Sequence, residues 1–76
     1  MVMFYGSRPS GMVVLEPYEA GKYIMYEKKI DGDVVENFEH TELVEQINNL
    51  INDGYQLQIA TPTQIDFLRF QFVYPD

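Results

Sequence analysis

The residues able to take part in acid–base chemistry gather around a single histidine. His40 is flanked by Glu39 and Glu42, and a carboxylate beside an imidazole could orient it as a general base. Catalysis would also need a nucleophile, and the only serines, Ser7 and Ser10, are distant in sequence and lack a nucleophile motif. A histidine beside a helix start is more typical of a surface or capping residue. We therefore predict no catalytic residues and a protein that is not an enzyme.

Two glycine-containing segments have a partial likeness to ligand-binding loops. Gly6–Gly11 has the two-glycine spacing of a phosphate-binding loop, but Met12 and Val13 stand where that motif requires Lys and Ser or Thr. Residues 31–33 (Asp-Gly-Asp) begin like a calcium loop with Glu42 at its twelfth position, yet the residues between them have the pattern of a strand. Both segments are predicted to be turns. With one histidine and no cysteine a tetrahedral zinc site is disfavoured, so we predict neither metal nor cofactor.

Acidic residues are the most informative group in the sequence. The 76 residues include 12 Asp and Glu against 5 Lys and Arg, a net charge of −7. This charge opposes direct binding to nucleic acid or to anionic membranes, because both need a cationic surface. Segment 27–53 is the most acidic part, and four glutamates within it recur at every third position. The predicted partner-binding acidic surface consists of Asp31, Asp33, Glu36, Glu39, Glu42 and Glu45.

Such a surface has two interpretations. A row of carboxylates could occupy the basic nucleic-acid-binding cleft of another protein, since DNA also presents regularly spaced negative charge. The alternative is a solvated face that keeps the domain soluble, with acids near the helix start favoured by the helix dipole.

The expected function is a non-enzymatic acidic module that binds another protein with a basic surface. In general type the chain is similar to the small acidic proteins that phages encode to inhibit host factors, including some anti-CRISPR proteins and nucleic-acid mimics; no motif assigns it to one of those families. Two alternatives stay open: a structural or assembly protein that homodimerises through an open sheet face, and a small-molecule-binding domain. The absence of cysteine fits a reducing compartment, and Met1–Tyr5 lacks the features of a signal peptide, so we predict a cytoplasmic location.

The elements that must position these residues form one α+β domain over residues 1–76. A helix is predicted at about 40–53, where apolar residues recur with a 3.6-residue period. Gly54 follows it as a left-handed C′ residue, with Tyr55 able to pack on the last turn as in a Schellman motif. Its start is either Glu39 or Thr41. The apolar stripe is Leu43, Val44, Ile47, Leu50 and Ile51.

Alternating apolar and polar residues predict strands on both sides of the helix. The expected architecture is a single antiparallel sheet of four to six strands with the helix packed on one face, in the order β-β-β-α-β-β. A further strand at Met1–Tyr5 is expected to pair across a loop at Gly6–Gly11. The other predicted strands are Met12–Glu16, Lys22–Ile30, Asp33–Phe38, Tyr55–Thr61 and Ile65–Tyr74.

Two details of the sheet depend on pairing. At residues 31–33 a two-residue turn would set Glu27 opposite Glu36, so a three-residue loop that pairs Lys28 with Glu36 is favoured slightly. On the last strand, one row is expected to face the helix: Leu68, Phe70, Phe72 and Tyr74. The opposite row would then lie on the open face, where it forms the predicted self-association surface. The residues of that surface are Phe67, Arg69 and Val73.

Overall fold

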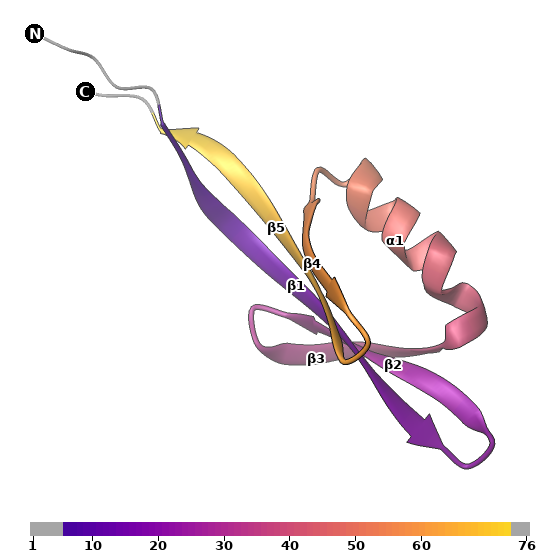
Figure 1. The fold of residues 1–76 in the computed structure, drawn as a ribbon. Helices are drawn as coiled ribbons and strands as arrows, with labels where there is room; N and C mark the ends of the chain where they lie inside the picture. Colours follow the sequence, from indigo (N-terminus) through magenta and orange to yellow (C-terminus); the bar gives the residue numbers. More distant parts are fainter. Residues whose placement is uncertain (1–5, 74–76) are drawn as a thin grey trace, which may run out of the picture.

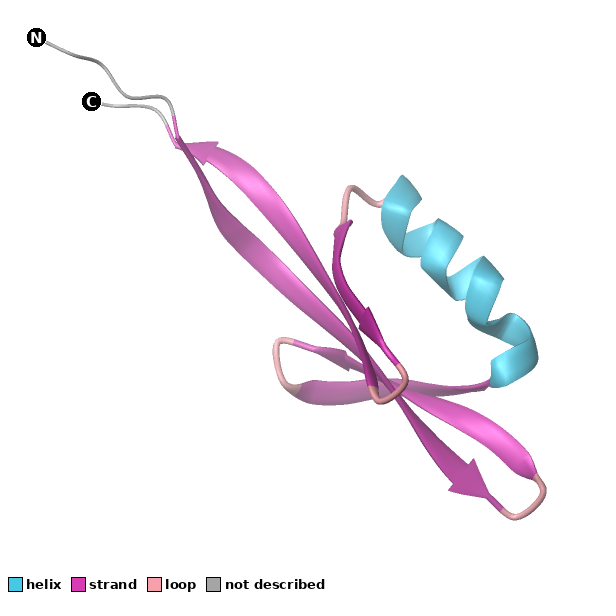
Figure 2. Cartoon of the chain, viewed as in Figure 1, coloured by secondary structure: helices cyan, strands magenta, loops and turns pink. Residues whose placement is uncertain are grey.

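The part of the chain that the structure describes folds into one antiparallel sheet with a single α-helix on one face (Figure 1). The computed structural model describes residues 6–73, and side-chain environments for residues 8–71. The predicted α+β class and element order are confirmed. The sheet has five strands in the order β3-β2-β1-β5-β4, and the helix is its only helical layer in this range (Figure 2). The elements are β1 (Gly6–Ala20), β2 (Tyr23–Ile30), β3 (Asp33–Glu39), the 3₁₀ turn η1 (His40–Glu42), α1 (Leu43–Asn52), β4 (Gln56–Thr61) and β5 (Gln64–Val73).

The central strand β1 is much longer than expected. The predicted loop at Gly6–Gly11 is wrong, because these residues belong to β1 and pair with β5, with a bulge at Ser10. Glycine and proline in this stretch suggested a loop, whereas pairing with the apolar end of β5 satisfies its backbone groups. The predicted strand Met1–Tyr5 lies outside the described residues.

The helix follows its predicted boundaries and caps. It begins after Glu39, whose backbone N–H donates to the Glu42 carboxylate (3.3 Å), and Leu43 packs on the cluster that contains Phe38. At the other end the Tyr55 N–H donates to the Leu50 carbonyl (3.0 Å) and the Gly54 N–H to that of Ile51 (3.0 Å). These are the two hydrogen bonds of a Schellman motif, and Gly54 has the required positive φ of 92°.

The β2–β3 hairpin combines features of both predicted registers. Its turn has two residues, Asp31 and Gly32, which both have positive φ (51° and 93°) as in a type I′ turn. The slightly favoured three-residue loop is therefore wrong. A bulge between the Lys29 and Lys28 pairs shifts the register, so that Lys28 still pairs with Glu36. The bulge thus relieves the repulsion between glutamates that had counted against the short turn.

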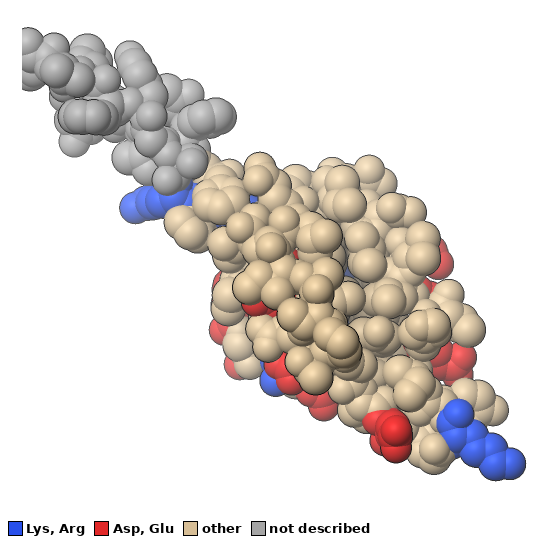
Figure 3. All heavy atoms as spheres, in the orientation of Figure 1, with Lys and Arg blue, Asp and Glu red and all other residues tan. Residues whose placement is uncertain are grey.

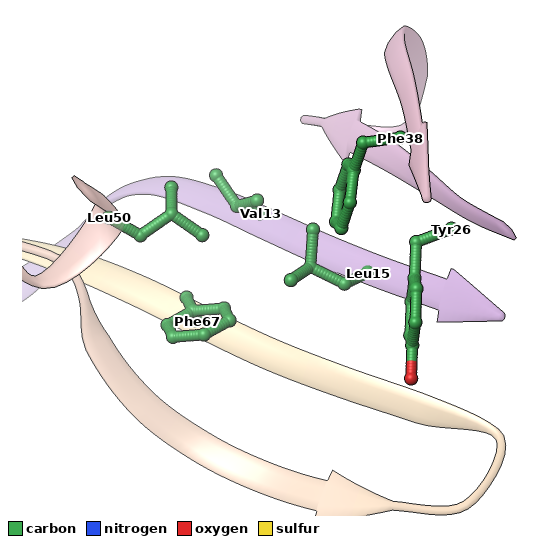
Figure 4. Packing of buried hydrophobic residues seen from close by; sticks show 6 residues of the cluster. All are labelled: Val13, Leu15, Tyr26, Phe38, Leu50 and Phe67. Carbon is green, nitrogen blue, oxygen red and sulfur yellow. The ribbon is translucent and has the colours of Figure 1, made fainter. Parts of the chain in front are cut away.

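The core lies between the sheet and α1 (Figure 4). Tyr26 and Phe38 stack with their ring centres 5.5 Å apart, on neighbouring strands β2 and β3. Side chains of α1 close the other side of the cluster. The buried members are Val13, Leu15, Tyr26, Phe38, Leu50 and Phe67.

The two faces of β5 are the reverse of the prediction. Phe67 pairs with Val13 and is 0% exposed in the core, whereas Leu68 and Phe70 lie half-buried on the face away from the helix. Both rows of β5 are apolar, so alternation alone does not select a face. The register with β1 decides which row of β5 faces the helix. Val13 and Leu15 face the helix side, so their partners on β5, Phe67 and Ile65, face it too. The side chains of Phe72 and Val73, and all of Tyr74, lie outside the described part.

Candidate functional site

The predicted acidic residues lie in sequence along one edge of the sheet and into the helix. Asp31 and Asp33 lie at the β2–β3 turn, Glu36 lies within the outermost strand β3, and the remaining three run from the end of β3 through η1 into α1. All six are exposed. The six residues thus lie on consecutive elements, with Glu36 and Glu39 on opposite faces of β3, and four of them also have structural partners.

Asp31 holds the hairpin turn against β1. Its carboxylate accepts a hydrogen bond from the Met12 N–H (3.0 Å), and its own backbone N–H donates to the Met12 carbonyl (2.9 Å). The side chain thus satisfies a backbone donor of the central strand where β2 ends. This contact gives Asp31 a structural role besides its negative charge.

Asp31→Ala should lower the free energy of unfolding by about 1–2 kcal/mol. It leaves the Met12 N–H without its acceptor and places alanine at a positive φ. Asp31→Asn should cost much less, because asparagine keeps an oxygen acceptor and tolerates that conformation. Urea denaturation followed by circular dichroism measures both. Equal losses for the two variants would contradict this role.

The glutamates along the edge form a loose network. Glu36 lies 3.8 Å from the ammonium of Lys28, and it accepts a hydrogen bond from Gln46 of α1 (3.3 Å). Glu39 and Glu42 form the capping pair at the helix start. Asp33 and Glu45 make no side-chain hydrogen bond or ion pair to described residues. We name the five carboxylates beyond the turn the acidic edge: Asp33, Glu36, Glu39, Glu42 and Glu45.

Two bases lie beside the acidic edge: Lys28 pairs with Glu36, and Lys22 of the β1–β2 turn lines the same hollow as Glu39 without an ion pair to it. Arg8 is near the start of β1, and Lys29 pairs with Glu16 on the open face (3.1 Å). On the side of the molecule shown in Figure 3, acidic atoms lie in separate groups around the border, and basic atoms appear mainly at the two ends. Lys28 is thus the one base within ion-pair distance of an acidic-edge carboxylate in the described range.

Arg69 was predicted to lie on the open face, but its side chain lies on the helix side, at the end of α1. Its guanidinium donates to the Asp53 carbonyl (2.9 Å) and lies 4.3 Å from the centre of the Tyr55 ring. Tyr55 in turn lies over Gly11 of β1, where an added methyl group would come within 3.3 Å of the phenol oxygen. Arg69 and Phe67 are therefore structural residues of the helix side, and the predicted self-association surface is wrong at both positions.

His40 lies in no catalytic arrangement among the described residues. Its ring stacks on Tyr26 at 6.2 Å between centres, at the border of an open hollow of about 180 Å³. Ser10 is engaged elsewhere, where its hydroxyl donates to the Arg69 carbonyl (3.3 Å). Within residues 6–73 no three side chains of the metal-binding types come together. The hollow is lined by Lys22, Tyr23, Ile24, Glu39, His40 and Thr41.

Sequence reasoning missed two apolar surfaces. Met12 is exposed on the open face, beside half-buried Leu68 and Phe70. The other is β4, where every side chain is exposed. A bulge at Gln58 turns Leu57 and Ile59 to opposite faces, whereas the regular alternation of a strand would place residues two positions apart on the same face. No signal in the sequence marks this bulge.

Comparison with protein-family models, with curated proteins and with solved structures finds no match to the chain. None of the helices in the described part is long and apolar enough to cross a membrane.

Proposed function

We propose that the chain is a non-enzymatic module that binds a protein with a basic surface through its acidic edge. The observation that supports this most directly is the run of five exposed carboxylates on consecutive elements, from the outermost strand β3 to the first turn of α1, with a single base paired to them. Carboxylates exposed in this way attract a cationic partner over a distance of about 10 Å at 0.1 M salt.

Helix capping accounts for only part of the acidic edge. Glu42 and Glu45 lie in the first turns, where the helix dipole favours negative charge, and Glu39 is the capping residue. Asp33 and Glu36 lie on β3, before the helix, and acidic residues are disfavoured in strands. Their presence on the outermost strand is better explained by a role at the surface.

The partner that fits best is a protein whose own ligand is nucleic acid. A basic cleft built to neutralise phosphates would also accept carboxylates held on a rigid strand and helix. Occupying that cleft would block the natural ligand, so we propose an inhibitor of the kind that phages direct against host proteins, acting in the cytoplasm.

The test compares two variants with the same net charge. One removes three of the five charges of the acidic edge and leaves the capping pair unchanged: Asp33→Asn, Glu36→Gln and Glu45→Gln. The control removes three charges elsewhere: Glu19→Gln, Asp53→Asn and Asp66→Asn. Affinity for an oligolysine peptide, measured by calorimetry, should fall by a factor between about 3 and 100 for the first triple variant, since each of the three exposed ion pairs contributes about 0.2–1 kcal/mol. The control should lose much less.

Binding should also weaken steeply as salt rises. Equal affinities for the two triple variants would show that the peptide responds to net charge alone, and would overturn the proposed site. Affinity that does not change with salt would overturn its electrostatic basis.

A further inference from the structure

The two outer strands of the sheet differ in how they are protected against pairing. β3 carries three acids, Asp33, Glu36 and Glu39, and charge on an edge strand is a common barrier to the addition of another strand. β4 has the sequence Gln-Leu-Gln-Ile-Ala-Thr, with neither charge nor proline. In the described sheet it has a neighbour on one side only, β5. Its outer backbone N–H and C=O groups therefore face away from the sheet.

The side chains of β4 expose apolar surface on both faces of this edge. Leu57 and Ile59 are each 52% exposed, and the bulge at Gln58 places Leu57 on the helix side and Ile59 on the open side. A strand added beside β4 would cover part of both side chains. The bulge itself twists the edge but introduces no charge against a neighbour.

The helix extends the apolar surface on the same side. The side chain of Gln46 donates to Glu36 of β3, and the flank of α1 that carries Gln46 therefore faces β3. Val44 and Ile51, seven residues apart and hence on one line of the helix, lie on the opposite flank. They are 70% and 52% exposed. This flank faces toward β5 and β4, and Figure 1 shows β4 beside the helix.

We propose that β4 pairs antiparallel with β4 of a second copy of this chain, which joins two five-stranded sheets into one. A strand is the occupant that satisfies the outer backbone groups of an edge, and an antiparallel pair of identical strands is symmetric. Because β4 carries no charged residue, it does not attract an acidic or a basic partner, and it does not repel the same strand of a second copy. We therefore take a second copy as the partner. Each copy has a net charge of −7, and at this edge no carboxylate of β4 opposes another.

The pairing would place the exposed flanks of the two helices toward each other across the two-fold axis. It would leave both β3 strands at the outer ends of the joined sheet, so the dimer would display two acidic edges. This inference does not rest on the proposed function. The salt dependence distinguishes the dimer from the proposed function. Binding through the acidic edge should weaken as salt rises, whereas the dimer should persist or tighten because repulsion between the two copies is screened.

The test is the oligomeric state of the whole chain by sedimentation over a range of concentrations. We expect a monomer–dimer equilibrium for the natural sequence. Leu57→Lys with Ile59→Lys should weaken the dimer roughly a hundredfold or more, because pairing would bury ammonium groups. The matched control is Val34→Lys with Val35→Lys on β3, where the side chains are 51% and 54% exposed. It adds the same charge and should leave the dimer intact.

Amide hydrogen exchange on the natural sequence gives a second readout that needs no substitution. Exchange in residues 56–61 should slow as concentration rises, while exchange in residues 33–39 should not. A natural sequence that stays monomeric at all concentrations would overturn the proposal. So would a β3 control that dissociates as readily as the β4 variant, or protection that appears on β3.

Discussion

Replacing Phe67 with alanine should leave the domain largely unfolded at 25 °C. Phe67 is fully buried among β1, β5 and α1, and removing a buried phenyl ring costs about 3–5 kcal/mol. A core of this size supplies a margin of only about 3–5 kcal/mol, and the chain has no disulfide to add to it. Far-ultraviolet circular dichroism during urea denaturation would show the loss.

Phe70→Ala is the matched control for this prediction. Phe70 lies on the same strand but on the opposite face, where it is half-buried and outside the core cluster. The same atoms are removed, so the two variants differ only in the environment of the ring. We expect a loss of about 1 kcal/mol for Phe70→Ala. A loss as large as that of Phe67→Ala would contradict the placement of the two faces.

This pair of phenylalanines also shows where sequence reasoning fails. The pattern of β5 identifies a strand correctly, but both of its rows are apolar, and period-two alternation cannot choose between them. The choice depends on the register with β1, a strand more than forty residues away in the chain. The sequence pattern carries no information about that pairing.

Local signals were read more successfully. The helix and its Gly54 end depend on residues within a few positions of one another, and both are confirmed; of the two starts left open, Glu39 and Thr41, the structure has Glu39. The sequence predicts a hairpin turn at residues 31–33 correctly but not the pairing of its strands. That pairing includes a bulge between the Lys29 and Lys28 pairs, which depends on the contacts between β2 and β3. Local chemistry thus predicts the elements, and tertiary pairing decides their faces.

The candidate site follows the same division. Exposure of the acidic residues was predictable from their spacing, since no core could hold so many unpaired carboxylates. Their partners were not predictable. Asp31 bonds to β1, which is nineteen positions away, and Arg69 reaches the carbonyl of Asp53. Such contacts exist only after the strands have paired.

The second large effect is expected on the helix, where two neighbouring residues of one apolar stripe have different environments. Leu50 is 3% exposed and packs in the core, whereas Ile51 is 52% exposed. Leu50→Ala should lower the free energy of unfolding by about 2–5 kcal/mol. The position is also the C3 residue of the Schellman motif, and Tyr55 at C″ packs against the cluster that contains Leu50, so the loss of the side chain also loosens this end of the helix.

Ile51→Ala removes the same number of carbon atoms one residue later. Alanine is also the better helix former, which offsets part of the lost contact, so we expect a change within about 1 kcal/mol. Urea denaturation at low protein concentration, where a dimer would be dissociated, compares the two variants. Similar losses would mean that both side chains are buried in the monomer. A small loss for Ile51→Ala together with a weaker dimer is the outcome expected if the exposed flank of α1 lies near the two-fold axis.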